Sequence, residues 1–216
     1  MTRGAVIWDM DGVLADSGPL HLEAWRRLAS ERGRGLTDEE FRQTFGMRND
    51  EIVTRLFGDL PPACASLLAE RKEGYFREAA RAHLEARAGA RRLLTELGNM
   101  GFLQALASSA PTANVELVLD TLGLRDSFQA VVTGADVRKG KPNPEVFLLA
   151  ADRLGVPPER CVVVEDAVVG VQAAKAANMR CIAVTSTNTR QELRQADLVV
   201  DSLDELQPEA FFALLS

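Results

Sequence analysis

The segment Ala5-Val6-Ile7-Trp8-Asp9-Met10-Asp11-Gly12-Val13 places two aspartates directly after a short run of apolar, strand-forming residues. Such a run, cut off by acids, is typical of a buried strand that ends at the functional edge of a sheet. Asp9 and Asp11 are two positions apart, so in an extended chain both carboxylates project the same way. Such a pair can hold Mg²⁺ or divide the roles of nucleophile and acid or base. An isolated Asp-x-Asp is more often a solvated turn, so this pair alone does not establish a site.

The region from Gly89 onward alternates short apolar runs with helical stretches. The predicted strands are 102–107, 130–133, 161–164, 181–184 and 198–200, and the predicted helices are 90–100, 112–122, 144–154 and 168–177. This alternation indicates βαβ units and a parallel sheet. The continuously apolar run 161–164 indicates a strand that is covered on both faces.

Between the first strand and Gly89 the chain has only helical patterns. Helices are predicted over about 19–32, 37–45, 49–56 and 63–87, the second from the capping-box pair Thr37 and Glu40. Crossovers between parallel strands are short, so this long helical stretch predicts a separate unit. We therefore predict an α/β fold, in which residues 1–16 and 89–216 form a Rossmann-like parallel sheet core and residues 17–88 form an inserted all-helical cap domain.

Three further segments follow predicted strands or connect them. Ser108 and Ser109 end the strand 102–107, where hydroxyl and backbone N–H groups can cradle a phosphoryl group, although serine is also a common helix cap. Lys141 stands in a loop with two prolines and either neutralises a phosphoryl group or is simply solvated. Glu165 and Asp166 end the strand 161–164, as Asp9 ends the first strand.

The carboxyl ends of parallel strands share one edge of the sheet, so these side chains are expected to converge. Carboxylates that face one cavity repel one another, and their pKa values rise unless a divalent cation offsets them. Oxygen ligands favour Mg²⁺ over Zn²⁺. With only two histidines in the chain, His21 and His83, there is little material for a histidine-based metal site.

Composition argues against several classes of protein. The net charge is −6, from 31 acidic and 25 basic residues, so we expect no binding to nucleic acid or to an anionic membrane. The three cysteines include no Cys-x-x-Cys pair, which argues against a disulfide framework or a zinc knuckle. No signal-peptide layout and no apolar stretch of about 18 residues is present, so we expect a cytoplasmic protein.

Taken together, these residues resemble the haloacid dehalogenase (HAD) superfamily of phosphotransferases. Its four motifs match in order the segment Asp9–Ser17, then Ser108, Lys141 and the Glu165-Asp166 pair. The resemblance spans essentially the whole chain. The helical insertion after the first motif is similar to the type-1 cap of the subgroup that holds β-phosphoglucomutase and small sugar-phosphate phosphatases.

The resemblance implies a role for each catalytic residue. Asp9 would be the nucleophile that becomes an aspartyl-phosphate, and Asp11 would protonate the leaving oxygen and then deprotonate the attacking water or hydroxyl. Ser108 and Lys141 would bind the transferring phosphoryl group, and we expect Ser109 to contact the substrate beside them. Dehalogenases of this fold lack the second aspartate, so Asp11 argues against carbon–halogen cleavage.

The resemblance also implies a metal site. Asp166 would hold Mg²⁺ together with Asp9 and the backbone carbonyl of Asp11. Glu165 would support the ion either as a direct ligand or through those ligands.

In the cap, the resemblance points to His21, Arg48 and Lys72 as substrate-binding residues. The alternatives are that His21 only orients the hinge of the cap and that Lys72 is one more charge on a solvated helix. Mutases of the subgroup typically carry a serine after the Glu-Asp pair and a Ser-Leu pair after the cap arginine. This chain has Ala167 and Asn49-Asp50-Glu51-Ile52 there, which favours the phosphatases.

We therefore expect a Mg²⁺-dependent phosphatase that hydrolyses small phosphomonoesters, sugar phosphates above all. The alternative is a β-phosphoglucomutase-like transfer of a phosphoryl group between two hydroxyls of one sugar. A protein that senses phosphate or acts as a scaffold without turnover is a third reading, which the filled catalytic positions disfavour. We expect a small phosphorylated metabolite as the partner and a monomeric protein.

Overall fold

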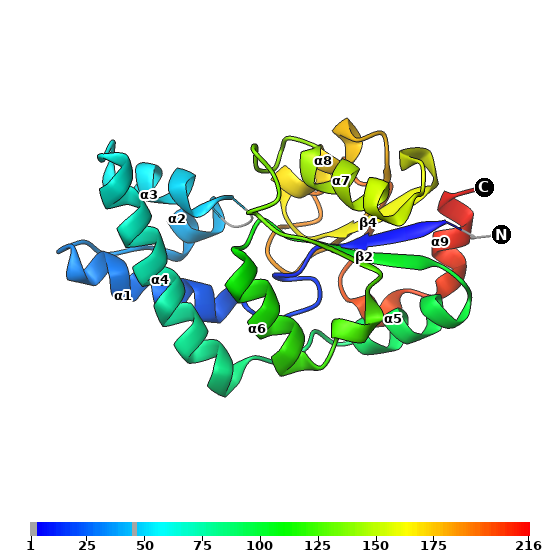
Figure 1. Ribbon diagram of the computed structural model, residues 1–216, viewed down its shortest axis with the longest axis horizontal. Coiled ribbons are helices and arrows are strands. Elements are labelled where there is room, and N and C mark those ends of the chain that lie inside the picture. The colour runs from blue at the N-terminus through cyan, green and yellow to red at the C-terminus, as the bar shows by residue number, and fades with distance from the viewer. Residues whose placement is uncertain (1–3, 45–46) are drawn as a thin grey trace.

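The computed structural model describes residues 4–44 and 47–216 and has an α/β architecture (Figure 1). All strands of its sheet run parallel, in the order β3-β2-β1-β4-β5-β6. The strands are β1 (Ala5–Trp8), β2 (Leu103–Ala107), β3 (Ala130–Val132), β4 (Cys161–Glu165), β5 (Arg180–Val184) and β6 (Leu198–Val200). The predicted α/β fold, a parallel sheet with a helical insertion, is confirmed.

The two central strands, β1 and β4, lie where the strand order reverses direction. In open α/β sheets ligands bind in the crevice at the carboxyl ends of such a pair. Trp8 is level with Leu106 of β2 and with Val164 of β4. The residues that follow these strands therefore start from one edge of the sheet, at nearly the same height.

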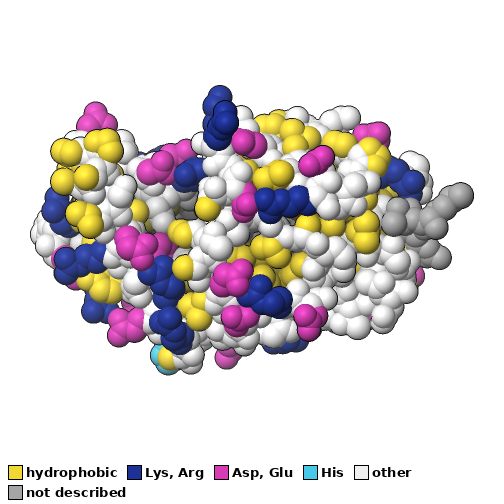
Figure 2. All heavy atoms as spheres, viewed as in Figure 1, with side chains coloured by type: hydrophobic (Ala, Val, Ile, Leu, Met, Phe, Trp, Pro, Cys, Tyr) yellow, Lys and Arg dark blue, Asp and Glu magenta, His cyan; other side chains and the backbone are white. Residues whose placement is uncertain are grey.

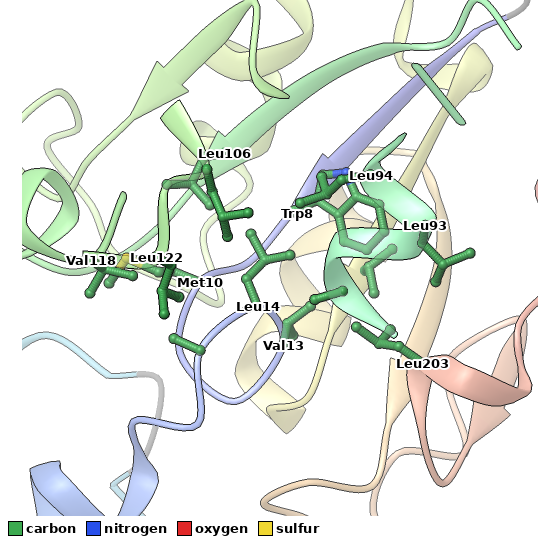
Figure 3. Close-up of a cluster of buried hydrophobic side chains, with 14 of the residues drawn as sticks. Trp8, Met10, Val13, Leu14, Leu93, Leu94, Leu106, Val118, Leu122 and Leu203 are labelled. Atoms are coloured by element: carbon green, nitrogen blue, oxygen red, sulfur yellow. The ribbon is translucent and has the colours of Figure 1, made fainter. Parts of the chain in front are cut away.

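Helices cover both faces of the sheet (Figure 1). They are α5 (Ala90–Asn99), α6 (Thr112–Leu122), α7 (Glu145–Leu154), α8 (Val168–Ala176) and α9 (Pro208–Leu214). Side chains of β1 alternate between two apolar clusters, with Ala5 and Ile7 on the side of α7 and α8. Trp8 lies on the opposite side, beside Leu93 and Leu94 of α5 (Figure 3). Burial on both faces explains why these strands read as continuous apolar runs.

The inserted helices lie beyond the carboxyl ends of the strands (Figure 1). We call α1 (Gly18–Glu31), α2 (Asp38–Arg42), α3 (Asn49–Phe57) and α4 (Pro62–His83) the helical insert. It has an apolar cluster of its own, which includes Trp25, Leu28 and Val53. The capping box of Thr37 and Glu40 is present, and α2 ends at Arg42. The end predicted for this helix, near residue 45, lies outside the described residues.

Two connecting segments between the insert and the sheet run side by side. The helix predicted to extend to about residue 87 ends at His83, because the residues after it are extended and pair with residues 14–16. Asp16 N–H donates to the carbonyl of Glu85, and Arg87 N–H donates to the carbonyl of Leu14, both at 2.9 Å. Helix propensity alone could not reveal this pairing, because it depends on a distant segment.

The surface view shows basic and acidic side chains interspersed, rather than gathered by sign, on the face that it presents (Figure 2). Within the described ranges, no helix is both long enough and apolar enough to cross a membrane. The C-terminal helix α9 is an element for which the sequence analysis made no prediction. The feature of the sequence that could have indicated this helix is Pro208, which suits the first turn of a helix.

Candidate active site

At the carboxyl ends of β1 and β4, three acidic side chains meet one lysine. Lys141 Nζ donates to Asp9 Oδ1 at 2.5 Å and to Glu165 Oε1 at 2.6 Å. One carboxylate oxygen from each of Asp9, Glu165 and Asp166 falls within a group whose members are all within 4.8 Å of one another. We call these four residues the core cluster. All four side chains are buried.

The surroundings of Asp166 fit a hard cation. Its Oδ2 accepts a hydrogen bond from Thr187 Oγ1 at 2.5 Å, and Asn188 donates to its backbone carbonyl. Its Oδ1 is buried and has no hydrogen-bond partner among the described residues. A buried carboxylate oxygen without a donor is costly unless something positive lies beside it. An oxygen-only donor set suits Mg²⁺, so Asp9, Glu165 and Asp166 could hold that ion.

Burial and mutual repulsion raise the pKa values of two carboxyl groups in the core cluster. Burial raises the pKa of Asp9 to about 8, although the Lys141 cation opposes that shift. Burial and the neighbouring carboxylates of Glu165 and Asp9 also raise the pKa of Asp166 well above its usual value. Burial would lower the pKa of Lys141, but Asp9 and Glu165 more than offset this and raise it. One lysine thus does not compensate three buried carboxylates.

Two glycines make room for these carboxylates. Gly12 has φ +78°, and a Cβ atom there would come within 1.9 Å of Asp166 Oδ2. Gly170 lies inside α8, where a Cβ atom would come within 1.8 Å of Glu165 Oε1. The other oxygen of Glu165 accepts the backbone N–H groups of Asp166 and Ala167. Sequence analysis overlooked Gly170, whose signal was a glycine inside a helical pattern.

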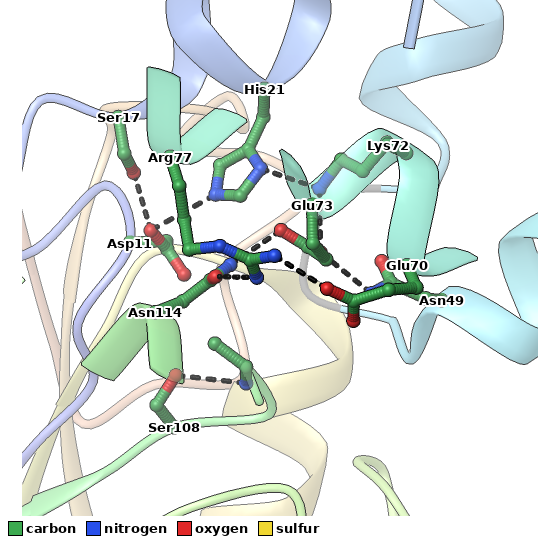
Figure 4. A network of polar contacts seen from close by, with 11 residues as sticks. Asp11, Ser17, His21, Asn49, Glu70, Lys72, Glu73, Arg77, Ser108 and Asn114 are labelled. Atoms are coloured by element: carbon green, nitrogen blue, oxygen red, sulfur yellow. Dashed lines mark hydrogen bonds and ion pairs between the residues drawn. The ribbon is translucent and has the colours of Figure 1, made fainter. Parts of the chain in front are cut away.

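Asp11 belongs to a second set of contacts, on the side of the insert (Figure 4). Its Oδ1 accepts a hydrogen bond from Ser17 Oγ at 2.6 Å and lies 3.2 Å from His21 Nε2. Lys72 Nζ lies 2.7 Å from His21 Nδ1. The His21 ring is also stacked on Phe76, with centroids 3.9 Å apart.

These contacts keep Asp11 ionised. Burial alone would raise the pKa of Asp11, but the nearby His21, the hydrogen bonds from His21 and Ser17, and the Lys72 cation outweigh burial and lower it. The Asp11 carboxylate is not part of the group formed by Asp9, Glu165 and Asp166. The predicted ligand role of its backbone carbonyl stays a prediction.

Lys72 is followed by a carboxylate that the sequence analysis overlooked. Glu73 Oε1 accepts hydrogen bonds from Lys72 Nζ at 2.9 Å and from Asn49 Nδ2 at 2.6 Å. Glu73 Oε2 accepts a hydrogen bond from Asn114 Nδ2 of the core helix α6. We call His21, Lys72, Glu73 and Asn114 the insert cluster. No local sequence pattern predicts this cluster, because its members come from three helices that are far apart in the sequence.

A cavity lies between the two clusters. Its core side includes Asp9, Asp11, Ser108 and Ser109, and its insert side includes Trp25 together with residues of the insert cluster. Ser108 is buried, and its hydroxyl accepts the N–H of Ala110 at 3.1 Å. Of the predicted substrate-binding residues, Ser109, His21 and Lys72 therefore line this cavity.

Arg48 lies outside the lining of that cavity. Its Nη1 lies 3.4 Å from the carbonyl oxygens of Gly134 and Val137, and its Nε lies 3.5 Å from Asp50. Its aliphatic part packs so close to Gly140 that a Cβ atom there would come within 2.6 Å of Arg48 Cδ. Arg48 thus connects the insert to the loop that carries Lys141.

Comparison with known proteins agrees with this geometry. A family model described as haloacid dehalogenase-like hydrolase matches residues 4–178. The chain belongs to this family. A phosphorylated carbohydrates phosphatase of Thermotoga maritima is 36% identical over 202 residues, which cover 90% of this chain and 92% of that protein. A β-phosphoglucomutase structure from Clostridium difficile superposes with a TM-score of 0.89 at 29% identity, covering 100% of this chain and 97% of that one.

A relative with further segments is the chloroplastic 5-amino-6-(5-phospho-D-ribitylamino)uracil phosphatase of Arabidopsis thaliana. It is 34% identical over 203 residues, and the match covers 93% of this chain but 54% of that protein. The HAD chain described here falls in the family IA subgroup of β-phosphoglucomutases and sugar-phosphate phosphatases. It is a phosphoric monoester hydrolase of a family with an aspartate nucleophile, which confirms the predicted family and enzyme class.

Proposed function

We propose that this HAD phosphatase depends on Mg²⁺ and hydrolyses small phosphomonoesters, sugar phosphates above all, through an aspartyl-phosphate at Asp9. The observation that carries the proposal is the core cluster, in which three buried carboxylates face a single lysine and one of them, Asp9, lines the cavity. Phosphoryl transfer needs in-line positioning and charge neutralisation, which Asp9 as nucleophile, Lys141 and a metal held by these carboxylates would supply. The T. maritima relative, a phosphatase of phosphorylated carbohydrates, supports the substrate class.

Asp9, Asp166 and Glu165 are the residues that we expect to hold the metal. When bound, Mg²⁺ supplies positive charge that stabilises the transferring phosphoryl group and the nucleophile together. Lys141 adds a second positive charge, and its hydrogen bond to Asp9 fixes the position of the nucleophilic carboxylate. Ser108 and the backbone N–H groups beside it would bind the phosphoryl oxygens.

In the first half-reaction, an oxygen of Asp9 bonds to phosphorus while the bond from phosphorus to the leaving oxygen breaks. Asp11 gives its proton to that oxygen, and the alcohol departs. In the second half-reaction, water attacks phosphorus and gives its proton to Asp11, which releases phosphate and restores Asp9. The lowered pKa of Asp11 suits the second, basic role. The negative charge of a bound phosphoryl group raises the pKa of Asp11 and favours the first, acidic role.

We also propose that residues 17–88 act as a cap and that residues 1–16 and 89–216 act as the catalytic core. The cavity has walls from both parts. A cap that closes over the phosphoryl group excludes bulk water and commits the substrate. His21 and Lys72 would then link the position of the cap to Asp11 through their hydrogen bonds.

The second candidate is transfer of the phosphoryl group between two hydroxyls of one sugar. It is favoured by the close superposition on the C. difficile β-phosphoglucomutase and by the burial of the core cluster. Ala167 and the Asn49–Ile52 stretch, which replace hydroxyl residues of the mutases, count against it.

The two candidates are separated by one experiment. Purified protein is incubated with a panel of sugar and polyol monophosphates, with Mg²⁺ or with EDTA, while released phosphate and isomerised sugar phosphate are measured. We expect phosphate release that requires Mg²⁺. Background release from every monophosphate, together with isomerisation that needs a bisphosphate primer, would establish the mutase instead.

A further inference from the structure

The part of the cavity that lies toward the helical insert is where the leaving group must sit, if Asp9 receives the phosphoryl group. Its walls are largely apolar, with Trp25, Met47 and Ile52. The titratable side chains of the insert that line it are His21, Lys72 and Glu73. We call this part the leaving-group compartment. Its chemistry decides which phosphomonoesters fit.

Lys72 brings little free charge to this compartment, because Glu73 neutralises it. Both residues are 2% exposed, and their side chains are joined at 2.9 Å. Further hydrogen bonds from Asn49 and Asn114 hold the Glu73 carboxylate (Figure 4). Burial by itself would raise the pKa of Glu73, but Lys72 and His21 outweigh it and lower the pKa. Glu73 is thus held as a carboxylate in the wall of the compartment.

The cations beyond Glu73 are likewise paired. Arg48 Nε lies 3.5 Å from Asp50, and the Arg77 guanidinium donates to Glu70 and to Asn114 Oδ1. Arg48, Asp50, Glu70 and Glu73 line one groove on this outer side. Lys72, Arg48 and Arg77 therefore each have a carboxylate partner among the described residues. A second phosphate on the substrate would find these three cations compensated and would approach Glu73.

We propose that Glu73 is a specificity-determining residue, which restricts the leaving group to uncharged hydroxylated molecules and rejects those that carry a second phosphate. The proposal rests on the phosphatase function proposed above. Among the described residues, Glu73 Oε2 accepts one hydrogen bond, from Asn114, which leaves a lone pair for a hydroxyl of the leaving group. By cancelling the Lys72 cation, Glu73 withholds from an anion the attraction that it would otherwise find there, which is a negative element of selectivity beside the favourable contact with hydroxyls.

The test compares two ligands that differ by one phosphate, glucose 6-phosphate and glucose 1,6-bisphosphate. Their kcat/KM values are measured from released phosphate at saturating Mg²⁺, in the wild type and in Glu73→Gln, Glu73→Asp and Glu78→Gln. Glu78→Gln is the matched control, because Glu78 lies on the same helix, pairs with Arg27 and does not line the cavity.

We expect the wild type to prefer the monophosphate and Glu73→Gln to reduce that preference by about tenfold or more, as loss of a unit charge at close range predicts. Glu73→Asp should keep most of the preference, and Glu78→Gln should keep all of it. Equal kcat/KM for both ligands in the wild type, or an unchanged ratio in Glu73→Gln, overturns the proposal.

A binding measurement separates this proposal from the catalytic one. Dissociation constants of glucose 6-phosphate, sorbitol 6-phosphate and glucose 1,6-bisphosphate are measured by calorimetry on Asp9→Asn and on Asp9→Asn/Glu73→Gln. Tighter binding of the monophosphates that fades in the double variant supports the role of Glu73, even if the wild type releases no phosphate and the proposed function fails. Failure of both monophosphates to bind, or tighter binding of the bisphosphate, overturns the role of Glu73.

Discussion

The two clusters of buried charge on either side of the cavity differ in how well they are balanced. In the core cluster, Lys141 faces three carboxylates, and the pKa values of Asp9 and Asp166 are raised. In the insert cluster, Glu73 and its neighbour Asp11 have lowered pKa values, because His21, Lys72 and amide groups surround them. Asp9, Asp166 and Glu73 are all buried, so for these three residues the difference in pKa shift lies in the partners and not in the depth.

This difference indicates that buried charges serve two purposes in this protein, one structural and one in ligand binding. A cluster that is complete in itself holds a shape, here the junction between α4 and α6. A cluster that lacks positive charge stores an unfavourable interaction until a cation binds. We therefore expect a bound cation to supply the core cluster with the positive charge that side chains already supply in the insert cluster.

The sharpest way to test the contrast is Asp9→Asn. We expect phosphate release to fall by about 10⁴-fold or more, as when a catalytic nucleophile is removed. We also expect the melting temperature in EDTA to stay equal or to rise, because one of three repelling carboxylates is gone. Steady-state assays and thermal unfolding check the two parts. A lower melting temperature in EDTA would show that the core cluster is balanced without metal.

The next effect concerns the space reserved for Glu165. Gly170→Ala places a Cβ atom within 1.8 Å of Glu165 Oε1, so the carboxylate or helix α8 must move. We expect a loss of about 1–3 kcal/mol in the free energy of unfolding, as for other overpacked sites, with a strong loss of activity. Urea titration and the phosphate-release assay measure both.

Its matched control is Gly74→Ala, a glycine inside the insert helix α4 with nothing within 4 Å of the added Cβ. There we expect a gain of about 0.5–1 kcal/mol, because alanine favours a helix more than glycine does. A similar loss of stability at both positions would mean that the close approach to Glu165 is not what Gly170 provides.

Metal binding should stabilise the core cluster measurably. For a ligand that binds only the folded state, a concentration of about one hundred times Kd adds about 2.7 kcal/mol. For a chain of this size, that corresponds to a rise of roughly 5–10 °C in melting temperature. We expect this rise with Mg²⁺ in the wild type and its loss in Asp166→Asn. An equal rise in both proteins would place the stabilising ion elsewhere.

The ends of strands are what the sequence predicts well in this protein. Asp9, Ser108 and the Glu165-Asp166 pair each follow an apolar run, and the geometry of a parallel sheet brings such ends to one edge. Lys141 comes from a loop and does not follow a strand, so the family motif predicted its role and the strand pattern did not. Sequence analysis therefore succeeded where local pattern and sheet topology together determine the position of a residue.

The insert cluster shows where that reasoning stops. Glu73 follows Lys72 on a helix with many charges, and the sequence does not distinguish it from Glu70 or Glu78. Its burial depends on Asn49 and Asn114, which helix packing brings to it from distant positions. Arg48 illustrates the converse, because a residue predicted to bind substrate makes its hydrogen bonds to the carbonyl groups of a core loop. The local sequence does not reveal which distant residues a side chain will contact in the folded protein.

Glu73→Gln also tests whether the insert cluster is a source of stability. Glu73→Gln leaves the buried Lys72 without a charged partner on α4, and we expect a loss of about 1–3 kcal/mol in the free energy of unfolding at pH 7. Because the folded protein lowers the pKa of Glu73 below the ordinary value of 4.5, its contribution is complete above pH 4.5 and is lost as the pH falls through the folded pKa. The difference between wild type and variant should therefore shrink in urea titrations as the pH is lowered from 7 toward 3. A difference that stays constant over this range would mean that Glu73 stabilises the junction by shape and not by charge, and the contrast with the core cluster would lose its electrostatic basis.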